Sequence, residues 1–318
     1  INVGSVALCE DENGGAVSPM YIIVRCKQKM NPRYLLRFLK SDAGQHQIRH
    51  RCEGAIRFQL RFSDLCNIPI FAPSLSEQEQ IVKLLDEADG LRKLRIQADR
   101  RTAEFTPALF HQMFSNPATN PKRWPIISAG ELMLSCEYGC SEKANENNAG
   151  VPMLRMGNVT SAGLLDLIDL KHVRLDEDDL EKYRLIEGDV LFNRTNSREL
   201  VGKTGMWDGR FEAIAASYFI RVRFDTEKEH PQHFTTFMNL PFMKRRLMEM
   251  ARGAIGQSNI NAQELKSIRV PVPPLPLQKE FAERVKEIRA LETAQVRSRA
   301  RLDALFASLL DKAFKGEL

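Results

Sequence analysis

The 318-residue sequence lacks the features that hold disulfide-rich or membrane proteins together. Its six cysteines include no C-x-x-C pair, and six are too few for a disulfide framework in a chain of this length. No apolar run approaches the ~18 residues of a membrane span. Aromatic residues make up only 8%, and the net charge is a mild +5. We therefore expect a reduced, cytoplasmic setting, and a charge that permits nucleic-acid binding without arguing for it.

Catalytic and cofactor motifs are missing as well. "LVGKTG" (Leu200–Gly205) ends like a phosphate-binding loop, but Ser197 stands where that loop needs its first glycine. "NPRY" (Asn31–Tyr34) resembles a tetrapeptide of amino-methyltransferases, but a helix start with proline in its first turn explains it better. His46 and His50 lack further metal ligands. The sequence therefore offers no convincing catalytic constellation, and we expect no catalytic residue and no metal site.

What the sequence does contain is an internal repeat with an offset of about 200 residues. "IFAPSLSEQEQIVKLL" (Ile70–Leu85) matches "VPVPPLPLQKEFAERV" (Val270–Val285), and "MYIIVR" (Met20–Arg25) resembles "YFIRVR" (Tyr218–Arg223). Each copy is expected to contain a strand, a helical stretch, a glycine-rich loop, an apolar strand, a proline corner and a long helix. The counterpart of Trp124 would lie about 76 residues before the first residue, so we expect the first copy to lack its beginning.

The stretch after each proline corner predicts a long helix. Apolar residues recur at three- and four-residue spacing between charged ones over about 35 to 40 residues. Core packing would explain one such helix, but two in matched register favour a paired coiled coil. Gly90 and Pro107 should weaken and break the first helix, with Thr106 capping a short final helix. The second helix has alanine at both equivalent positions and should be continuous.

Between the long helices the sequence predicts an α+β fold. Short apolar stretches ("MLRM", "DVLFN", "YFIRVRF", "IRVPV") separated by turn-rich loops indicate an irregular α/β domain, with one helix near Pro231–Ala251. The predicted division is the end of a first irregular domain (1–74), the first long helix (75–115), a linker (116–123), a second irregular domain (124–274) and the second long helix (275–318).

Three loops of the second domain are rich in planar hydrogen-bonding groups. "LRMGNVTSAG" contributes Arg155 and Asn158, "NRTNSRELVGK" contributes Arg194, Asn196, Ser197 and Lys203, and "GQSNINAQ" contributes Gln257, Ser258 and Asn259. Lysine and arginine also crowd one expected helix end, at Lys244, Arg245 and Arg246. Arginine can bridge guanine O6 and N7, and asparagine or glutamine can bridge adenine N6 and N7. Ordinary solvated loops remain an equally favoured explanation on these grounds alone.

The whole arrangement resembles the specificity subunit of type I restriction–modification enzymes. The resemblance rests on "RGAIGQSNINAQELKSIRVPVPPLPLQKEFAERV" (Arg252–Val285), on "IEGDVLFNRTNSRELVGKTG" (Ile186–Gly205) and on "IPIFAPSLSEQEQIV" (Ile68–Val82). These motifs stand in the family's order, and the junction between domain and helix occurs twice. Arg198 departs from the family, which often has proline there.

The resemblance implies two target-recognition domains that each read half of a split DNA sequence, joined by two long antiparallel coiled-coil helices. It implies double-stranded DNA, two methyltransferase subunits and restriction subunits as partners. S-adenosylmethionine, ATP and Mg would belong to those partners, so the resemblance implies that this chain binds no cofactor and is not itself an enzyme. It assigns base reading to Arg155, Asn158, Arg194, Asn196, Ser197, Gln257, Ser258 and Asn259. It assigns phosphate contacts to Lys203, Lys244, Arg245 and Arg246. It assigns contacts with partner subunits to Gln78, Ile81, Gln278 and Phe281.

Two other classes of protein stay open at this stage. A coiled-coil scaffold that never touches DNA would explain the helices and the repeat, but it would leave the arginine- and amide-rich loops without a role. A methyltransferase or nuclease would need a cofactor loop or a carboxylate–lysine cluster, and the sequence shows neither.

Overall fold

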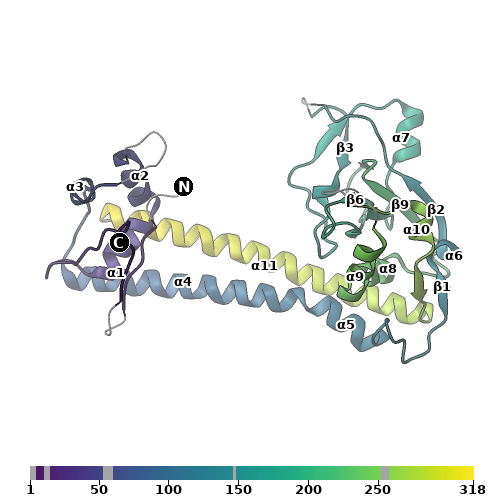
Figure 1. Ribbon diagram of the computed structural model, residues 1–318, viewed down its shortest axis with the longest axis horizontal. Helices are drawn as coiled ribbons and strands as arrows, with labels where there is room; N and C mark the ends of the chain where they lie inside the picture. Colours follow the sequence, from purple (N-terminus) through teal and green to yellow (C-terminus); the bar gives the residue numbers. More distant parts are fainter. Residues whose placement is uncertain (1–4, 11–14, 53–59, 146–147, 252–257) are drawn as a thin grey trace. The chain divides into compact units, whose positions relative to one another are not determined.

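The structure is a computed structural model that describes residues 5–10, 15–52, 60–145, 148–251 and 258–318. The chain divides into two compact units, which we call the helical unit (Ile1–Arg100 with Thr293–Leu318) and the mixed unit (Arg101–Glu292). Figure 1 shows the elements of each unit, coloured along the sequence. Within the described residues, no helix is both long and apolar enough to cross a membrane.

The helical unit consists of short helices packed around parts of two long ones. Its helices are α1 (Pro32–Lys40), α2 (Asp42–Arg51), α3 (Phe62–Cys66), α4 (Leu75–Ala103) and the C-terminal part of α11 (Leu275–Lys315). Helix α1 starts at Pro32, where a missing N–H removes no helical hydrogen bond. Asn31 caps it by accepting hydrogen bonds from the backbone N–H groups of Arg33 and Tyr34. The helix start predicted at "NPRY" is therefore confirmed.

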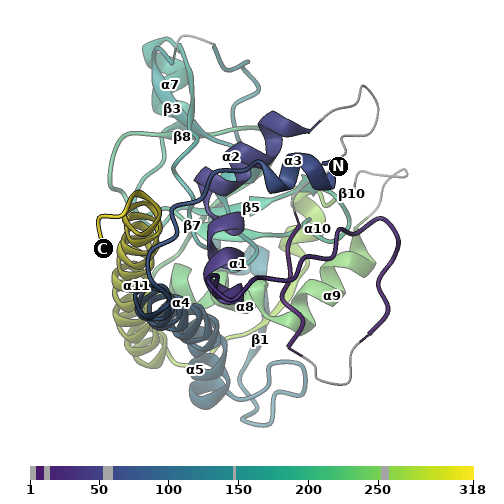
Figure 2. The ribbon, with the colours of Figure 1, turned by 90° about the vertical axis from the view of Figure 1, so that its left-hand side faces the viewer.

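Helices α4 and α11 run antiparallel within the helical unit, and Figure 2 looks along them. Arg299 donates a hydrogen bond to Asp99 at 3.1 Å, and Arg92 donates one to Asp303 at 2.7 Å. Exposed ion pairs of this kind stabilise little, so the apolar seam between the helices carries most of the pairing energy. The seam contains Ile81, Val82 and Leu85 of α4 and Ala313 of α11, together with Tyr34 of α1, and Phe306, Leu309, Leu310 and Phe314 pack against them.

The mixed unit combines an antiparallel sheet with helices. Its helices are α5 (Phe105–Phe114), α6 (Ala129–Leu132), the 3₁₀ helix η1 (Met156–Asn158), α7 (Glu177–Tyr183), α8 (Pro231–Asn239), α9 (Pro241–Met250), α10 (Ala262–Lys266) and the first part of α11. Its strands are β1 (Ile126–Ser128), β2 (Met133–Tyr138), β3 (Val151–Leu154), β4 (Lys171–Val173), β5 (Val190–Asn193), β6 (Thr195–Asn196), β7 (Thr204–Met206), β8 (Ile214–Ala215), β9 (Phe219–Phe224), β10 (Ser258–Asn259) and β11 (Arg269–Pro271). A four-stranded sheet has the order β2-β9-β5-β7, and a three-stranded one the order β4-β3-β8.

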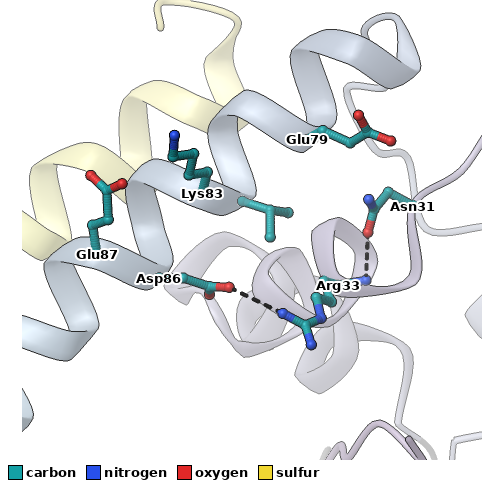
Figure 3. Close-up of a pocket in the computed structure, with 7 residues that line it drawn as sticks. Asn31, Arg33, Glu79, Lys83, Asp86 and Glu87 are labelled. Carbon is teal, nitrogen blue, oxygen red and sulfur yellow. Dashed lines mark hydrogen bonds and ion pairs between the residues drawn. The ribbon is translucent and has the colours of Figure 1, made fainter.

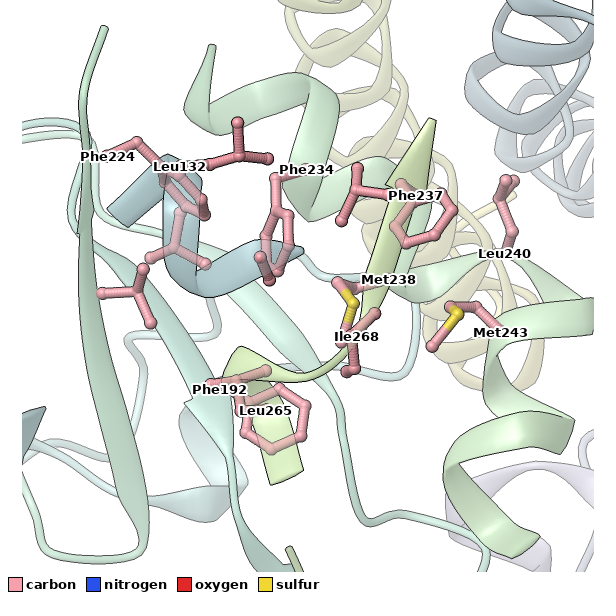
Figure 4. Packing of buried hydrophobic residues seen from close by; sticks show 14 of the residues in the cluster. Leu132, Phe192, Phe224, Phe234, Phe237, Met238, Leu240, Met243, Leu265 and Ile268 are labelled. Carbon is pink, nitrogen blue, oxygen red and sulfur yellow. The ribbon is translucent and has the colours of Figure 1, made fainter. Parts of the chain in front are cut away.

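The main core of the mixed unit lies between the four-stranded sheet and α8 (Figure 4). Val190 and Phe192 of β5 point into this core, while Leu191 between them points into a second cluster around Trp207. Strand β5 is therefore buried on both faces, which explains why it reads as a continuous apolar run. Strand β9 alternates instead, because Arg221 and Arg223 face away from the main core. Arg221 pairs with Glu137, and Arg223 pairs with Asp189.

Each long helix is tied to its unit by one buried glutamine. Gln78 accepts a hydrogen bond from the N–H of Asn31 and donates to the carbonyls of Lys29 and Pro73. Gln278 makes the same three contacts, with the N–H of His230 and the carbonyls of Lys228 and Pro273. Neither side chain has exposed surface. One amide thus joins the start of the long helix to the start of a short helix, α1 or α8.

An aromatic residue from a helix end covers each of these glutamine junctions: the end of α11 covers the one at Gln78, and α5 covers the one at Gln278. In the helical unit, Phe314 at the end of α11 packs edge-on against Tyr34 of α1, with ring centroids 5.2 Å apart. In the mixed unit, Phe114 at the end of α5 packs edge-on against His233 of α8 at 4.8 Å. The two units are therefore closed in the same way, each by the helix end that follows the other unit's proline corner.

The helix predictions hold with two corrections. The long helices begin at Leu75 and Leu275 as predicted, and α11 is continuous for 41 residues. The first breaks as predicted, but the N-cap of α5 is Glu104 rather than Thr106, which lies inside the helix. The helix expected near Pro231–Ala251 is two helices, because Pro241 cannot donate the next helical hydrogen bond and starts α9 instead.

The strand predictions hold in the mixed unit and fail in the helical unit. Three of the four predicted stretches contain β5, β9 and β11, and the fourth, "MLRM", overlaps the last two residues of β3. Residues 20–25 form no strand, and Met20, Tyr21 and Ile23 are 77%, 63% and 70% exposed. Their counterpart β9 is held between β2 and β5, whereas the described part of the helical unit contains no strand to pair with them. Residues 68–72, the counterpart of β11, form no strand either.

Replacing Gln78 by alanine should lower the free energy of unfolding by about 2–3 kcal/mol, since backbone groups of Lys29, Asn31 and Pro73 would be left unpaired in the interior. Exposed Gln80 on the same helix is the matched control, and its replacement by alanine should change that free energy by less than about 0.5 kcal/mol. Urea titration of both variants measures the difference. Equal effects would contradict the role of the buried amide.

Candidate nucleic-acid interface

Loops that are far apart in the sequence meet on one side of the mixed unit. Strands β6 and β10 pair, with Asn196 opposite Ser258. Next to them, the backbone N–H of Arg194 donates to the carbonyl of Tyr218 at 2.9 Å. The Nζ of Lys203 donates to the carbonyl of Met156 at 2.7 Å and so ties in the loop after β3. All three polar loops of the sequence analysis thus have described residues in one region.

Two of the predicted base-reading arginines present their guanidinium groups at this region. Arg155 follows β3, its side chain is 36% exposed, and its Nη2 lies 3.5 Å from a carboxylate oxygen of Asp169. Arg194 lies over the ring of Tyr138, with its Cζ 4.6 Å from the ring centroid. Such stacking holds a guanidinium plane in place and leaves its edge able to donate hydrogen bonds. Both arginines therefore suit the role predicted for them.

Asn158 has a different role from the one predicted. It is only 5% exposed, and its Oδ1 accepts a hydrogen bond from the backbone N–H of Arg155. Its Nδ2 donates to the carbonyls of Asp166 and Asp169 at 2.8 and 3.2 Å. The amide is fully used inside the protein. Asn158 therefore braces the loop beside Arg155, and the prediction that it reads a base is corrected.

The two lysines predicted to hold phosphates also turn inward. Lys203 is 7% exposed and donates to the carbonyl of Met156, and burial lowers its pKa. Lys244 donates to the carbonyl of Gly202 at 2.9 Å. Burial and the charge of nearby Lys203 lower the pKa of Lys244 to about 7. Both ammonium groups serve internal carbonyls, so the phosphate contacts assigned to them are corrected.

The remaining predicted DNA contacts are placed as follows. Arg245 and Arg246 are exposed on α9 and stay candidates for phosphate contacts. Asn259 is exposed, whereas Ser258 is only 7% exposed. Asn196, the last residue of β6, and Ser197 after it are partly buried, and the Oδ1 of Asn196 accepts a hydrogen bond from the N–H of Ser197. Gln257 lies outside the described residues.

The four predicted partner contacts lie inside the fold. Gln78, Gln278 and Phe281 have no exposed surface, and Ile81 is 6% exposed. This differs from the expected position, because a side chain without exposed surface cannot touch a partner subunit directly. A notch of about 480 Å³ lies where α1 meets α4, and Asn31, which bonds to Gln78, lines it (Figure 3). It is lined by Asn31, Arg33, Glu79, Val82, Lys83, Asp86 and Glu87.

Sequence reasoning missed several residues of the interface. Tyr138 and Tyr218 are 46% and 40% exposed beside Arg194. Ile168 and Asp169 lie in the loop that Asn158 braces. A second hollow, of about 450 Å³, is lined by Arg155, Tyr218 and this loop. No spacing in the sequence links these residues, since only the packing of the loops brings them together. Within the part of the chain that the structure describes, no three His, Cys, Asp or Glu side chains are placed to hold a metal ion.

An α+β unit with converging arginine-bearing loops defines a candidate nucleic-acid-binding domain, and comparisons with known proteins agree with this class. A family model described as the type I restriction modification DNA specificity domain matches residues 121–299. The match covers more than half of the chain. This protein therefore belongs to that family.

Curated relatives and solved structures of the same kind match most of the chain. The EcoKI specificity subunit of Escherichia coli (strain K12) is 29% identical, over 93% of this chain and 68% of its own. The StySPI specificity subunit of Salmonella potsdam is 27% identical, over 93% and 67%. The S subunit structure from M. genitalium covers 90% of this chain and 73% of its own at 14% identity and a TM-score of 0.55. A chain from a structure titled for complex assembly of the type I R-M system covers 90% and 72% at 20% identity, with a TM-score of 0.57. These structural likenesses show the fold.

Replacing Lys244 by methionine should remove a pH dependence of stability. The pKa of Lys244 is about 7 in the folded chain and about 10.4 when unfolded. Between these values the unfolded state binds more protons, so stability rises with pH there. We expect wild type to gain stability relative to Lys244→Met between pH 7 and pH 9, measured by urea unfolding. A difference between the two proteins that is constant over this range would contradict a buried, perturbed Lys244.

Proposed function

We propose that this chain recognises a DNA sequence for a type I restriction–modification complex. The names of its family and relatives, DNA specificity domain and specificity subunit, support this function. The observation that carries the proposal is the convergence of described residues of three loops on one side of the mixed unit. That side presents the guanidinium groups of Arg155 and Arg194 together with the exposed amide of Asn259. Guanidinium and amide groups are the side chains that read base edges in the major groove.

We further propose that the two units descend from two copies of one target-recognition module. The shared glutamine junction, at Gln78 and Gln278, and the shared aromatic cover, at Phe314 and Phe114, support this reading. In it, α4 and α11 form an antiparallel coiled coil, and each copy serves one half of a split recognition sequence. Because α11 has 41 residues, it is about 60 Å long at ~1.5 Å per residue.

The proposed partners are double-stranded DNA, two methyltransferase subunits and restriction subunits, in the cytoplasm. S-adenosylmethionine, ATP and Mg would act in those partners, and this chain would be non-catalytic. The exposed charges around the notch at Glu79, Lys83 and Glu87 are a surface on which a partner could dock. Buried Gln78 would shape that surface from inside rather than contact the partner.

A scaffold that joins proteins without touching DNA is the second candidate. The apolar seam between α4 and α11 favours it, because that seam needs no DNA to explain it. The stacked Arg194 argues for DNA instead, since its partly buried guanidinium lies over Tyr138 rather than in an ion pair with a carboxylate among the described residues. A complex with the methyltransferase subunits that shows no salt-dependent DNA affinity would favour the scaffold.

Two classes of arginine variant should behave differently in the complex with methyltransferase subunits. Arg155→Ala should weaken binding to the target by about tenfold or more and relax preference at one base pair, while leaving unrelated DNA unaffected. The double variant Arg245→Ala with Arg246→Ala should weaken all DNA alike and reduce the salt slope by up to ~1.8. Fluorescence anisotropy on target and scrambled duplexes over a salt series measures both.

Arg210 supplies a control for that comparison. It is an exposed arginine of the mixed unit that pairs with Asp208. Its replacement by alanine should change neither the specificity nor the salt slope. Identical behaviour of the Arg155 and Arg245/Arg246 variants would contradict the assignment of one to bases and the other two to phosphates.

A further inference from the structure

Ile168 is the most exposed large apolar residue of the described chain, at 97%. It lies in the loop between η1 and β4, where the leucines at 165, 167 and 170 pack inward and the exposed neighbours are Asp166 and Asp169. Leaving an isoleucine side chain in water forfeits the free energy that its burial would contribute. A single exposed apolar residue is common on protein surfaces, so the case for a function depends on how this one is held and what surrounds it.

The loop holds Ile168 in a fixed position. The Nδ2 of Asn158 donates to the carbonyl of Asp166 and to that of Asp169, and so grips the chain on both sides of Ile168. The N–H of Asp166 donates to the carbonyl of Asn158 at 2.8 Å, and the N–H of Ile168 donates to Oδ1 of Asp166 at 3.2 Å. A loop fixed in this way loses little conformational entropy when it binds.

The surroundings favour a nucleic acid over a protein as the ligand of this loop. Ile168 shares the rim of the 450 Å³ hollow with Arg155 and Tyr218, in the region where the polar loops meet. The exposed residues beside it, Asp166 and Asp169, are acidic, because Leu165, Leu167 and Leu170 of the same loop pack against the cluster around Trp207. The core of a protein interface needs several exposed apolar side chains together. The carboxylates of Asp166 and Asp169 would be repelled by phosphates. The tip of the loop is therefore suited to base edges, where carboxylates can accept hydrogen bonds and apolar groups can contact the thymine methyl.

We propose that Ile168 is a specificity-determining residue that contacts the C5-methyl group of one thymine in the major groove, next to the base contacted by Arg155. The proposal rests on the proposed function of DNA reading. It adds a residue that no motif predicted, and it names the chemical group that the residue recognises. Asn158 would be the positioning residue that aims it.

The test replaces each thymine of the target, one at a time, by deoxyuridine, which lacks only the C5-methyl group. The target is first identified by mapping methylation, and binding is measured with the chain in complex with its methyltransferase subunits. Wild type should lose about three- to fivefold affinity at one position, as expected for one buried methyl group. Ile168→Ala should bind the thymine and deoxyuridine forms of that site equally well.

Ile186→Ala is the matched control, because Ile186 is another exposed isoleucine of the mixed unit, at 49%. It should keep the wild-type response to deoxyuridine. If wild type responds at no thymine, or if Ile168→Ala keeps the same loss at the same position, the inference is overturned while the proposed function stands.

Two further outcomes separate the inference from its premise. If Ile168→Ala no longer co-elutes with the methyltransferase subunits but retains the deoxyuridine response, the loop is a protein contact and the inference is overturned. If the wild-type complex shows no preference for any DNA sequence, the proposed function itself fails, and the inference fails with it.

Discussion

One buried amide at the start of each long helix is the interaction on which the rest of this structure depends. Gln78 and Gln278 each satisfy three backbone groups, and these groups belong to the proline corner and to the start of a short helix. Because an unpaired buried backbone group costs about 1–3 kcal/mol, few other side chains could serve there. The amide fixes how a long helix leaves its unit. Everything that packs on that helix, including the aromatic rings of Phe314 and Phe114, depends on this geometry.

The polar loops of the candidate interface are also held by buried side chains that bond to the backbone. Asn158, Lys203 and Lys244 all donate hydrogen bonds to main-chain carbonyls of loops or strand ends. Asn158 and Lys203 hold the segments that carry Arg155 and Ile168, and Lys244 holds the loop that carries Lys203. A site that must read bases needs side chains placed within a fraction of an ångström, and irregular loops reach that precision only when buried polar groups brace them.

The sequence was sufficient to predict the long helices and the strands of the core, because their signals are local and periodic. Leu75 and Leu275 start helices where proline corners end, and β5 and β9 lie in apolar stretches. It failed for residues 20–25, whose composition suits a strand but which need neighbouring strands to become one. The site was only partly predictable for a related reason. Many polar loop residues hydrogen-bond to the protein's own backbone, and the sequence does not show which of them do so and which are free to contact a ligand. Asn158 and Arg155 come from the same loop, yet one faces inward and the other outward.

The central claim is that this chain directs methylation to a split DNA sequence. The most direct test maps adenine methylation by single-molecule sequencing, in the organism that carries the gene and in a strain from which the gene is deleted. We predict that the deletion removes methylation from one split motif with a fixed gap of unspecified bases. A methylation pattern that is the same in both strains would contradict the claim.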